Sequence, residues 1–290
     1  MKTSLTLPAP AKLNLFLHIT GQRENGYHEL QTVFQIIDYC DRLTFTPTRS
    51  PEITISSNTN DIALQDNLIW RAASLLKQKT ACTYGANITL NKTIPMGGGL
   101  GGGSSDAATT LIGLNHCWNT DLTINQLIDM GRTLGADVPV FIRGNSAWAE
   151  GIGDQLSDLE LPEVWFLVLT PDCHVETKAI FSHKDLTRDS KTIRMADFLA
   201  ERSWNDCEAV VTSLYSEVDQ ALKLLKTIKA DARMTGTGAC VFCSFQHKHD
   251  ALEALEITKH QVSGFVAKGL NQSPLQKKLA LSQHFNKKRG

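Results

Sequence analysis

The residues best suited to chemistry lie in a glycine-rich run at positions 95–108, in which six of the fourteen residues are glycine. Glycine lets the backbone approach an anion closely, and a helix that starts after such a run adds the partial positive charge of its N-terminus. The run follows an alternating strand pattern at 86–91 and precedes a helical pattern. We expect Ser104 or Ser105 to cap that helix and Asp106 to lie in its first turn. The run predicts a phosphate-binding site, and a flexible glycine-rich linker is the weaker interpretation because strong elements flank it.

The type of phosphate loop follows from what accompanies the glycines. The sequence has no Gly-Lys-Ser or Gly-Lys-Thr, which excludes a Walker loop, and it has no protein-kinase motif set. The spacing of Gly97, Gly99 and Gly102 formally satisfies the dinucleotide fingerprint. That fingerprint also needs an acidic residue about twenty positions on, at the end of a strand, whereas Asp121 precedes a predicted helix. A nucleotide phosphate site of another kind remains.

Three further segments carry polar residues in unusual settings: 10–15 with 26–28, 135–139, and the small-residue turn at 234–242. Each also has an ordinary interpretation. Lys12 could be a solvent-facing lysine of a strand, and Asp137 could cap the segment that Val138-Pro139 begins. The tyrosine and histidine at 27–28 could be surface residues of a loop. The residue types alone leave these alternatives open.

Taken in order, these motifs resemble those of the GHMP kinase superfamily, named for galactokinase and the homoserine, mevalonate and phosphomevalonate kinases. The matching segments are 10–14, 26–28, 97–108, 135–139, 205–208 and 265–269. The resemblance implies an α+β fold of two domains with mixed and antiparallel sheets, and an active site in the cleft between the halves. It also implies an ATP-dependent kinase whose acceptor is an alcohol carrying a cytidine diphosphate group, with Mg²⁺ as a further cofactor.

The resemblance assigns a role to individual positions. Lys12 and Asp137 would be the catalytic pair, and Ser105 would be the magnesium ligand, with Ser104 as the neighbouring candidate. The residues implied for the acceptor are Asn14, Tyr27, His28, Thr177 and Phe181, of which Tyr27 and Phe181 would enclose the cytosine and His28 would bond its edge. Those implied for ATP are Asn67, Pro95, Met96, Gly97, Gly98, Gly99, Leu100, Gly101, Gly102, Gly103, Ser104, Ser105, Asp106, Gly236 and Gly238. Phosphoryl transfer needs positive charge around the moving group and an acceptor oxygen held in line, which a lysine, an aspartate and a glycine loop can supply.

The elements that must position these residues follow from periodicity. Alternation predicts strands at 5–7, 13–19, 32–37, 42–46, 52–56 and 86–91, and later at 164–169 and 240–245. Helical spacing predicts helices at 68–79, 107–117, 123–134 and 219–227. We expect an ATP-binding domain at 1–161, a substrate-side domain at 162–284 and a basic tail at 285–290.

Composition limits the remaining function classes. The formal net charge is −1 without a basic stripe, which argues against a nucleic-acid partner, and no run approaches the ~18 apolar residues of a membrane span. Seven scattered cysteines without a second CxxC favour a reducing compartment, the cytoplasm. The sequence does not distinguish a monomer from a homodimer. Rival functions are a homoserine- or mevalonate-type kinase, a nucleotide-binding regulator without catalysis and, least supported, a nicotinamide oxidoreductase.

Overall fold

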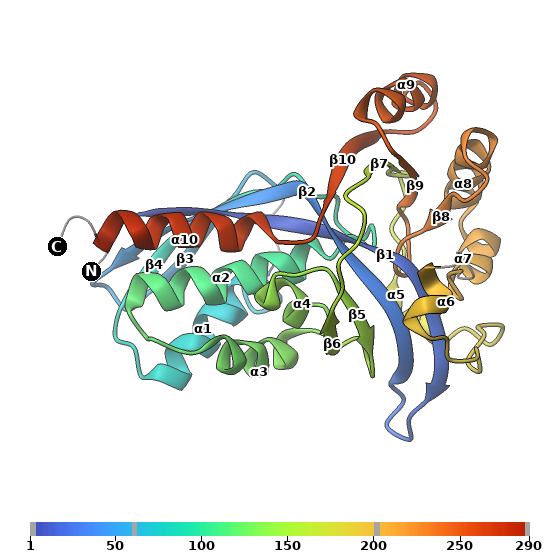
Figure 1. Cartoon of the computed structure of the whole chain (residues 1–290). Coiled ribbons are helices and arrows are strands. Elements are labelled where there is room, and N and C mark those ends of the chain that lie inside the picture. The colour runs from blue at the N-terminus through green and yellow to red at the C-terminus, as the bar shows by residue number, and fades with distance from the viewer. Residues whose placement is uncertain (1–3, 60–62, 200–203, 288–290) are drawn as a thin grey trace.

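The computed structural model describes residues 4–59, 63–199 and 204–287. The strands form one large mixed sheet, and the helices pack around it in two groups (Figure 1). This arrangement confirms the expected α+β class. None of the helices within the described ranges is long and apolar enough to cross a membrane.

The first two strands are much longer than the sequence pattern suggested. β1 (Leu5–Gln22) and β2 (His28–Thr48) pair antiparallel along almost their whole length, where we expected four shorter strands. The prediction was wrong because register shifts, including one between Pro10 and Lys12, interrupt the period-two pattern without ending the strands. Residues 9–14 of β1 are all buried, so both faces of the strand are covered at this point. A strand covered on both faces shows no simple alternation of polar and apolar residues.

The remaining strands extend the sheet on either side of this pair. Their order is β3 (Ile53–Ser57), β4 (Gly85–Asn91), β2, β10 (Gly264–Leu270), β7 (Trp165–Leu169), β9 (Val241–Phe245) and β8 (Arg233–Met234). β5 (Ala147–Glu150) pairs with β2 and with β6 (Gln155–Asp158). The β3–β4 pair is parallel and every other pair is antiparallel. β10 joins the strands of the N-terminal half (β3, β4 and β2) to those of the C-terminal half (β7, β9 and β8), because it pairs with both β2 and β7.

The two largest hydrophobic cores among the described residues lie along this sheet. The first contains buried residues of α1 (Leu68–Thr80), α2 (Gly102–Trp118), α3 (Ile124–Leu134) and α4 (Val138–Arg143), and also Leu275 of α10 (Pro274–Lys287). Figure 1 shows α10 lying against this first group, so the chain returns to the N-terminal half at its end. The second core is covered by α5 (Thr177–Phe181), α7 (Glu208–Leu214), α8 (Ser216–Ile228) and α9 (Lys248–Thr258), while the short α6 (Met195–Leu199) packs beside Trp148. The β1 residues Leu17 and Ile19 belong to this second core, so β1 reaches both.

The start of α2 differs from the prediction in a way that matters for the site. The helix begins at Gly102 after Gly101, whose φ of 72° is left-handed, and no side chain caps it. The expected serine cap was wrong because a glycine in this conformation starts the helix earlier. Asp106 consequently lies beyond the first turn, and it is buried there. Of the predicted basic tail, residues 285–287 continue α10 and 288–290 lie outside the described residues.

Candidate active site

A cavity of about 450 Å³ lies where the glycine-rich run meets β1 and the second half of the chain. Its wall contains most of the residues that the sequence singled out, namely Lys12, Asn14, Asn67, residues 95–104, Asp106, Asp137, Thr177, Phe181, Gly236 and Gly238. Ser105, Tyr27 and His28 do not line it. The fold therefore brings segments separated by more than two hundred residues to one site.

The glycine loop is held by its carbonyl oxygens. The carbonyls of Gly97 and Gly98 accept hydrogen bonds from the N–H groups of Ala239 and Cys240, each at 3.2 Å. The carbonyl of Leu100 accepts one from the backbone of β1 at 3.0 Å. With these oxygens occupied, the N–H groups are the polar backbone atoms that the loop offers to a ligand, next to the N-terminus of α2. The loop and the turn at 235–240 thus form one anion-binding wall.

Close approach makes glycine necessary in this wall. A Cβ atom at Gly99, whose φ is 73°, would lie 2.3 Å from the carbonyl oxygen of Thr235. A Cβ at Gly98 would lie 2.6 Å from the sulfur of Cys240. The second-half turn therefore packs directly on the loop, and the sequence pattern of glycines reflects this contact as well as any ligand.

Lys12 of β1 lines the cavity, and its side chain is only 3% exposed. Its ammonium group lies 3.3 Å from the carboxylate of Asp137, donates to the carbonyl of Gly99 at 3.0 Å and also donates to Oδ1 of Asn14. The solvent-facing lysine that the sequence allowed is thus not what the structure contains. Asp137 precedes α4 but makes no side-chain capping bond, so the capping interpretation does not apply either.

Asn14 orients Lys12 and is itself held on both sides. Its side-chain nitrogen donates to the hydroxyl of Thr32 at 2.9 Å, and its backbone N–H donates to the hydroxyl of Thr235 at 2.9 Å. The Thr235 hydroxyl also lies 3.4 Å from the carbonyl of Gly99. Thr235 therefore links the strand that carries Lys12 to the glycine loop. The sequence assigned no role to either threonine, although Thr235 lies in the turn at 234–242, because a buried threonine has no signature outside its contacts.

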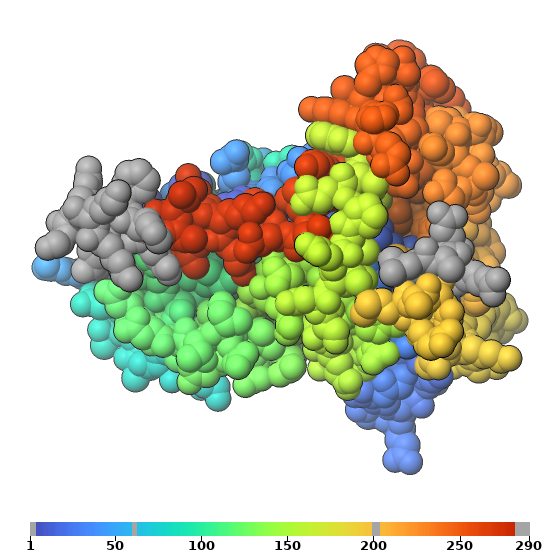
Figure 2. Space-filling view, in the orientation of Figure 1, coloured from blue at the N-terminus to red at the C-terminus, as the bar shows by residue number. Residues whose placement is uncertain are grey.

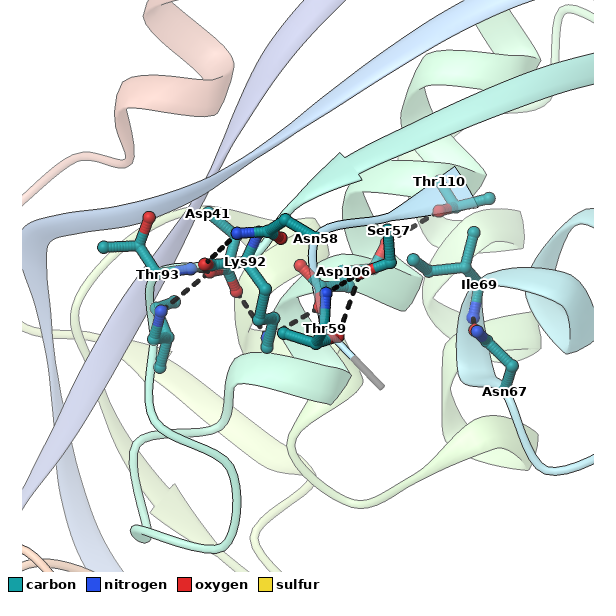
Figure 3. A network of polar contacts seen from close by, with 11 residues as sticks. Asp41, Ser57, Asn58, Thr59, Asn67, Ile69, Lys92, Thr93, Asp106 and Thr110 are labelled. Atoms are coloured by element: carbon teal, nitrogen blue, oxygen red, sulfur yellow. Dashed lines mark hydrogen bonds and ion pairs between the residues drawn. The ribbon is translucent and has the colours of Figure 1, made fainter. Parts of the chain in front are cut away.

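One end of the cavity is polar and lies between α1 and β4. Asn67 caps α1 by accepting a hydrogen bond from the N–H of Ile69 at 2.9 Å. Figure 3 shows a network beside it in which Lys92 lies between Asp41 and Asp106, at 2.5 and 2.8 Å. Burial raises the pKa of Asp106 to about 7, with Lys92 opposing the shift and Asp41 adding to it. Sequence reasoning missed Lys92 and Asp41, which precede the glycine run in the chain without any motif around them.

The other end of the cavity is aromatic. Phe181 lines it, and the ring of His28 stacks on Phe181 with centroids 5.1 Å apart. Thr177 lies one turn before Phe181 and its hydroxyl is 2.9 Å from that of Thr237. Tyr27 is 59% exposed in the turn between β1 and β2, the blue projection at the lower edge of Figure 2. The structure therefore brings His28 and Phe181 together and leaves Tyr27 outside the cavity.

The structure favours the other of the two serines at the site, and it adds an arginine to which the sequence assigned no role. Ser104 lines the cavity, whereas the hydroxyl of Ser105 is buried and has no hydrogen-bond partner within the described part of the chain. Arg188, which the sequence did not single out, donates from Nε to Nε2 of His28 at 3.1 Å. Burial and the nearby charge of Arg188 lower the pKa of His28. No sequence signal would have found this contact, which joins residues 160 positions apart.

The chain is similar to known proteins over most of its length. The GHMP kinase N-terminal domain model matches residues 67–145, and the GHMP kinase C-terminal model matches residues 185–261. The 4-diphosphocytidyl-2-C-methyl-D-erythritol kinase of Shewanella frigidimarina is 53% identical over 95% of each chain. That of Nitrosococcus oceani is 52% identical over 93% of this chain and 96% of its own.

The chain is a GHMP kinase and belongs to the 4-diphosphocytidyl-2-C-methyl-D-erythritol kinases. A crystal structure of a 4-(cytidine 5′-diphospho)-2C-methyl-D-erythritol kinase superposes on this kinase with a TM-score of 0.80 at 31% identity, covering 91% of this chain and 99% of that one. A homoserine kinase from Cytophaga hutchinsonii gives a TM-score of 0.64 at 16% identity, covering 94% and 97%. The second likeness shows the shared fold alone.

Proposed function

We propose that this kinase transfers the terminal phosphoryl group of ATP to the 2-hydroxyl of 4-diphosphocytidyl-2-C-methyl-D-erythritol, in the non-mevalonate route to isoprenoids. The observation that carries the proposal is the position of Lys12, whose ammonium contacts both the Gly99 carbonyl of the phosphate loop and the carboxylate of Asp137. A group that touches both sides of the cavity can neutralise charge on a phosphoryl group as it passes from one to the other. The relatives' names supply the acceptor.

The roles of the chain's own groups follow from this geometry. The N–H groups of residues 97–101 and the N-terminus of α2 hold the phosphates. The carboxylate of Asp137 accepts a hydrogen bond from the acceptor hydroxyl, aims its oxygen and receives its proton as the new bond forms. The ammonium group of Lys12 holds the carboxylate of Asp137 in place, while Asn14 holds Lys12 in place.

The cavity wall also fits a magnesium ion that accompanies ATP. Mg²⁺ prefers hard oxygen ligands and retains several waters, so it needs few groups from the protein. Ser104 offers a hydroxyl to the cavity, whereas the Ser105 hydroxyl is buried away from it. We therefore assign the contact to Ser104 in preference to Ser105. When bound, the ion neutralises phosphate charge and orients the oxygens.

The aromatic end of the cavity suits the cytidine group. Phe181 offers a ring for the base to stack on, and His28 next to it offers a polar edge. In this proposal Tyr27 covers the base from the β1–β2 turn when the substrate is bound. In the same proposal Thr177, which lines the cavity, contacts the substrate near its phosphates.

Several broader assignments belong to the same proposal. The ATP-binding half comprises residues 1–161 and the substrate-side half 162–284, and the protein acts as a monomer or homodimer on a small molecule. We also place this activity in the cytoplasm, a reducing compartment, and the thiols of Cys40, Cys82, Cys173, Cys207, Cys240 and Cys243 are in keeping with it.

The test is ADP release by the purified protein with ATP and Mg²⁺. We would compare the cytidyl substrate with homoserine and mevalonate, with EDTA and the Asp137→Asn variant as controls. Turnover with the cytidyl substrate alone, lost in both controls, is expected. Turnover only with another acceptor would keep the kinase and reject the substrate, and tight ATP binding without any turnover would favour a regulator.

A further inference from the structure

The contact between Arg188 and His28 fixes where the imidazole carries its proton. Nε of Arg188 lies 3.1 Å from Nε2 of His28. A guanidinium group only donates hydrogen bonds, so Nε2 is the acceptor and carries no hydrogen. A neutral imidazole has one N–H, which must then be on Nδ1. The contact therefore selects one of the two tautomers of His28.

Three further hydrogen bonds hold the guanidinium group of Arg188 in the orientation that contacts Nε2 of His28. Its Nη1 donates to the carbonyl of Leu186 at 3.0 Å. Its Nη2 donates to the carbonyls of Phe181 and His183, at 3.0 and 2.8 Å. These three bonds use the planar fork that distinguishes arginine from lysine. Arg188 thus ties the segment that carries Phe181 to the imidazole stacked upon it.

His28 is also kept neutral at this position. The residue is 7% exposed, and burial followed by the charge of Arg188 lowers its pKa. Within the part of the chain that the structure describes, Nδ1 has no hydrogen-bond partner. His28 therefore has one N–H donor to offer, beside the Phe181 ring that lines the cavity.

We propose that Arg188 is a positioning residue that holds His28 as its Nδ1–H tautomer and thereby makes the acceptor site select cytosine over uracil. This inference rests on the proposed function, because it concerns the base of that substrate. Cytosine presents an acceptor at N3, which an Nδ1–H donor satisfies. Uracil presents an N–H at the same position, so two donors would face each other and both would lose their partners.

The tautomer of His28 can be determined by NMR, without an activity assay. We would record the imidazole nitrogen resonances of the full chain labelled with ¹⁵N-histidine, and assign His28 by its loss in His28→Gln. The wild type is expected to carry the proton of His28 on Nδ1, and Arg188→Met is expected to move it to Nε2. The matched control is Arg194→Met, since that arginine is 85% exposed and pairs with Asp197. A wild-type His28 protonated on Nε2 would overturn the proposal.

Selectivity is then measured as the ratio of kcat/KM for the cytidyl substrate to that for its uridyl analogue. The ratio is expected to fall about ten- to hundredfold in Arg188→Met, as for loss of one buried hydrogen bond that leaves its partner unsatisfied. If Arg188 had a purely structural role, its loss would lower kcat/KM equally for both substrates. An unchanged ratio would therefore overturn the selectivity assignment. If the wild type used neither substrate, the proposed function would fail, while the resonances would still report the tautomer.

Discussion

The ammonium group of Lys12 lies 3.3 Å from the carboxylate of Asp137, although one residue comes from the middle of β1 and the other from the start of α4. The carboxylate is 32% exposed, so an acceptor can reach it, whereas the lysine is almost fully enclosed. The pair therefore combines a fixed positive charge with an accessible proton acceptor. This is the arrangement that phosphoryl transfer to an alcohol requires.

Asp137→Asn tests this relationship directly. An amide of the same shape cannot take the proton, so kcat is expected to fall about 10²–10⁴-fold, the usual contribution of a general base. The KM for ATP should change little, because Asp137 does not belong to the glycine loop. Steady-state kinetics over a range of both substrates would measure this, with Asp158→Asn as the control on an exposed ion pair. An undiminished kcat would mean that Asp137 has no part in proton transfer.

Gly99→Ala should destabilise the protein and weaken ATP binding. The new methyl group would lie 2.3 Å from the Thr235 carbonyl in a left-handed residue, and that conformation alone costs about 1–2 kcal/mol. Gly103→Ala is the matched control, because its Cβ would meet only Leu68 at 3.5 Å inside a helix. That change should preserve stability or raise it by about 0.5–1 kcal/mol. Urea unfolding of the apo proteins separates the two, and equal losses would contradict the packing argument.

Thr235→Val should loosen the link between β1 and the glycine loop. Valine keeps the shape but removes the oxygen that accepts the Asn14 N–H, and an unpaired buried donor costs about 1–3 kcal/mol. We expect lower stability together with a lower kcat, since Asn14 in turn positions Lys12. Thr235→Ser keeps the hydroxyl and should recover most of both. Failure of serine to do better than valine would show that the hydroxyl is not what matters.

Asp106 predicts a particular dependence of stability on pH. Its pKa is raised by burial from 3.8 to about 7 in the folded protein, so between these values the native state holds a proton that the unfolded chain releases. Protonation of Asp106 therefore contributes its full amount to the free energy of unfolding below pH 3.8, and this contribution is lost as the pH rises towards 7. Asp106→Asn should therefore lose less stability than the wild type across this window.

Denaturant unfolding at several pH values measures that difference. Asp129→Asn is the control, because this aspartate is 70% exposed on α3. The advantage of Asp106→Asn is expected to be greatest above pH 7. Parallel curves for Asp106→Asn and the wild type would show that Asp106 ionises normally.

The sequence by itself determined the class of fold, the phosphate loop and the family. These follow from local features, namely the density of glycine in 95–108, the helical spacing after it and the order of the short motifs. Helices such as α3, expected at 123–134 and found at Ile124–Leu134 with its capping box at Thr123, depend mainly on near neighbours in the chain. Such features can be read without knowing what packs against them.

Only the tertiary structure decided which side chains meet. The continuity of β1 and β2, the buried Asp41–Lys92–Asp106 network and the Arg188–His28 bond all depend on residues far apart in sequence. The same holds for Ser105, which is adjacent to Ser104 but turned into the interior because α2 begins at Gly102. Burial and side-chain direction are set by the packing of whole helices and strands against one another, and a local sequence pattern does not predict that packing.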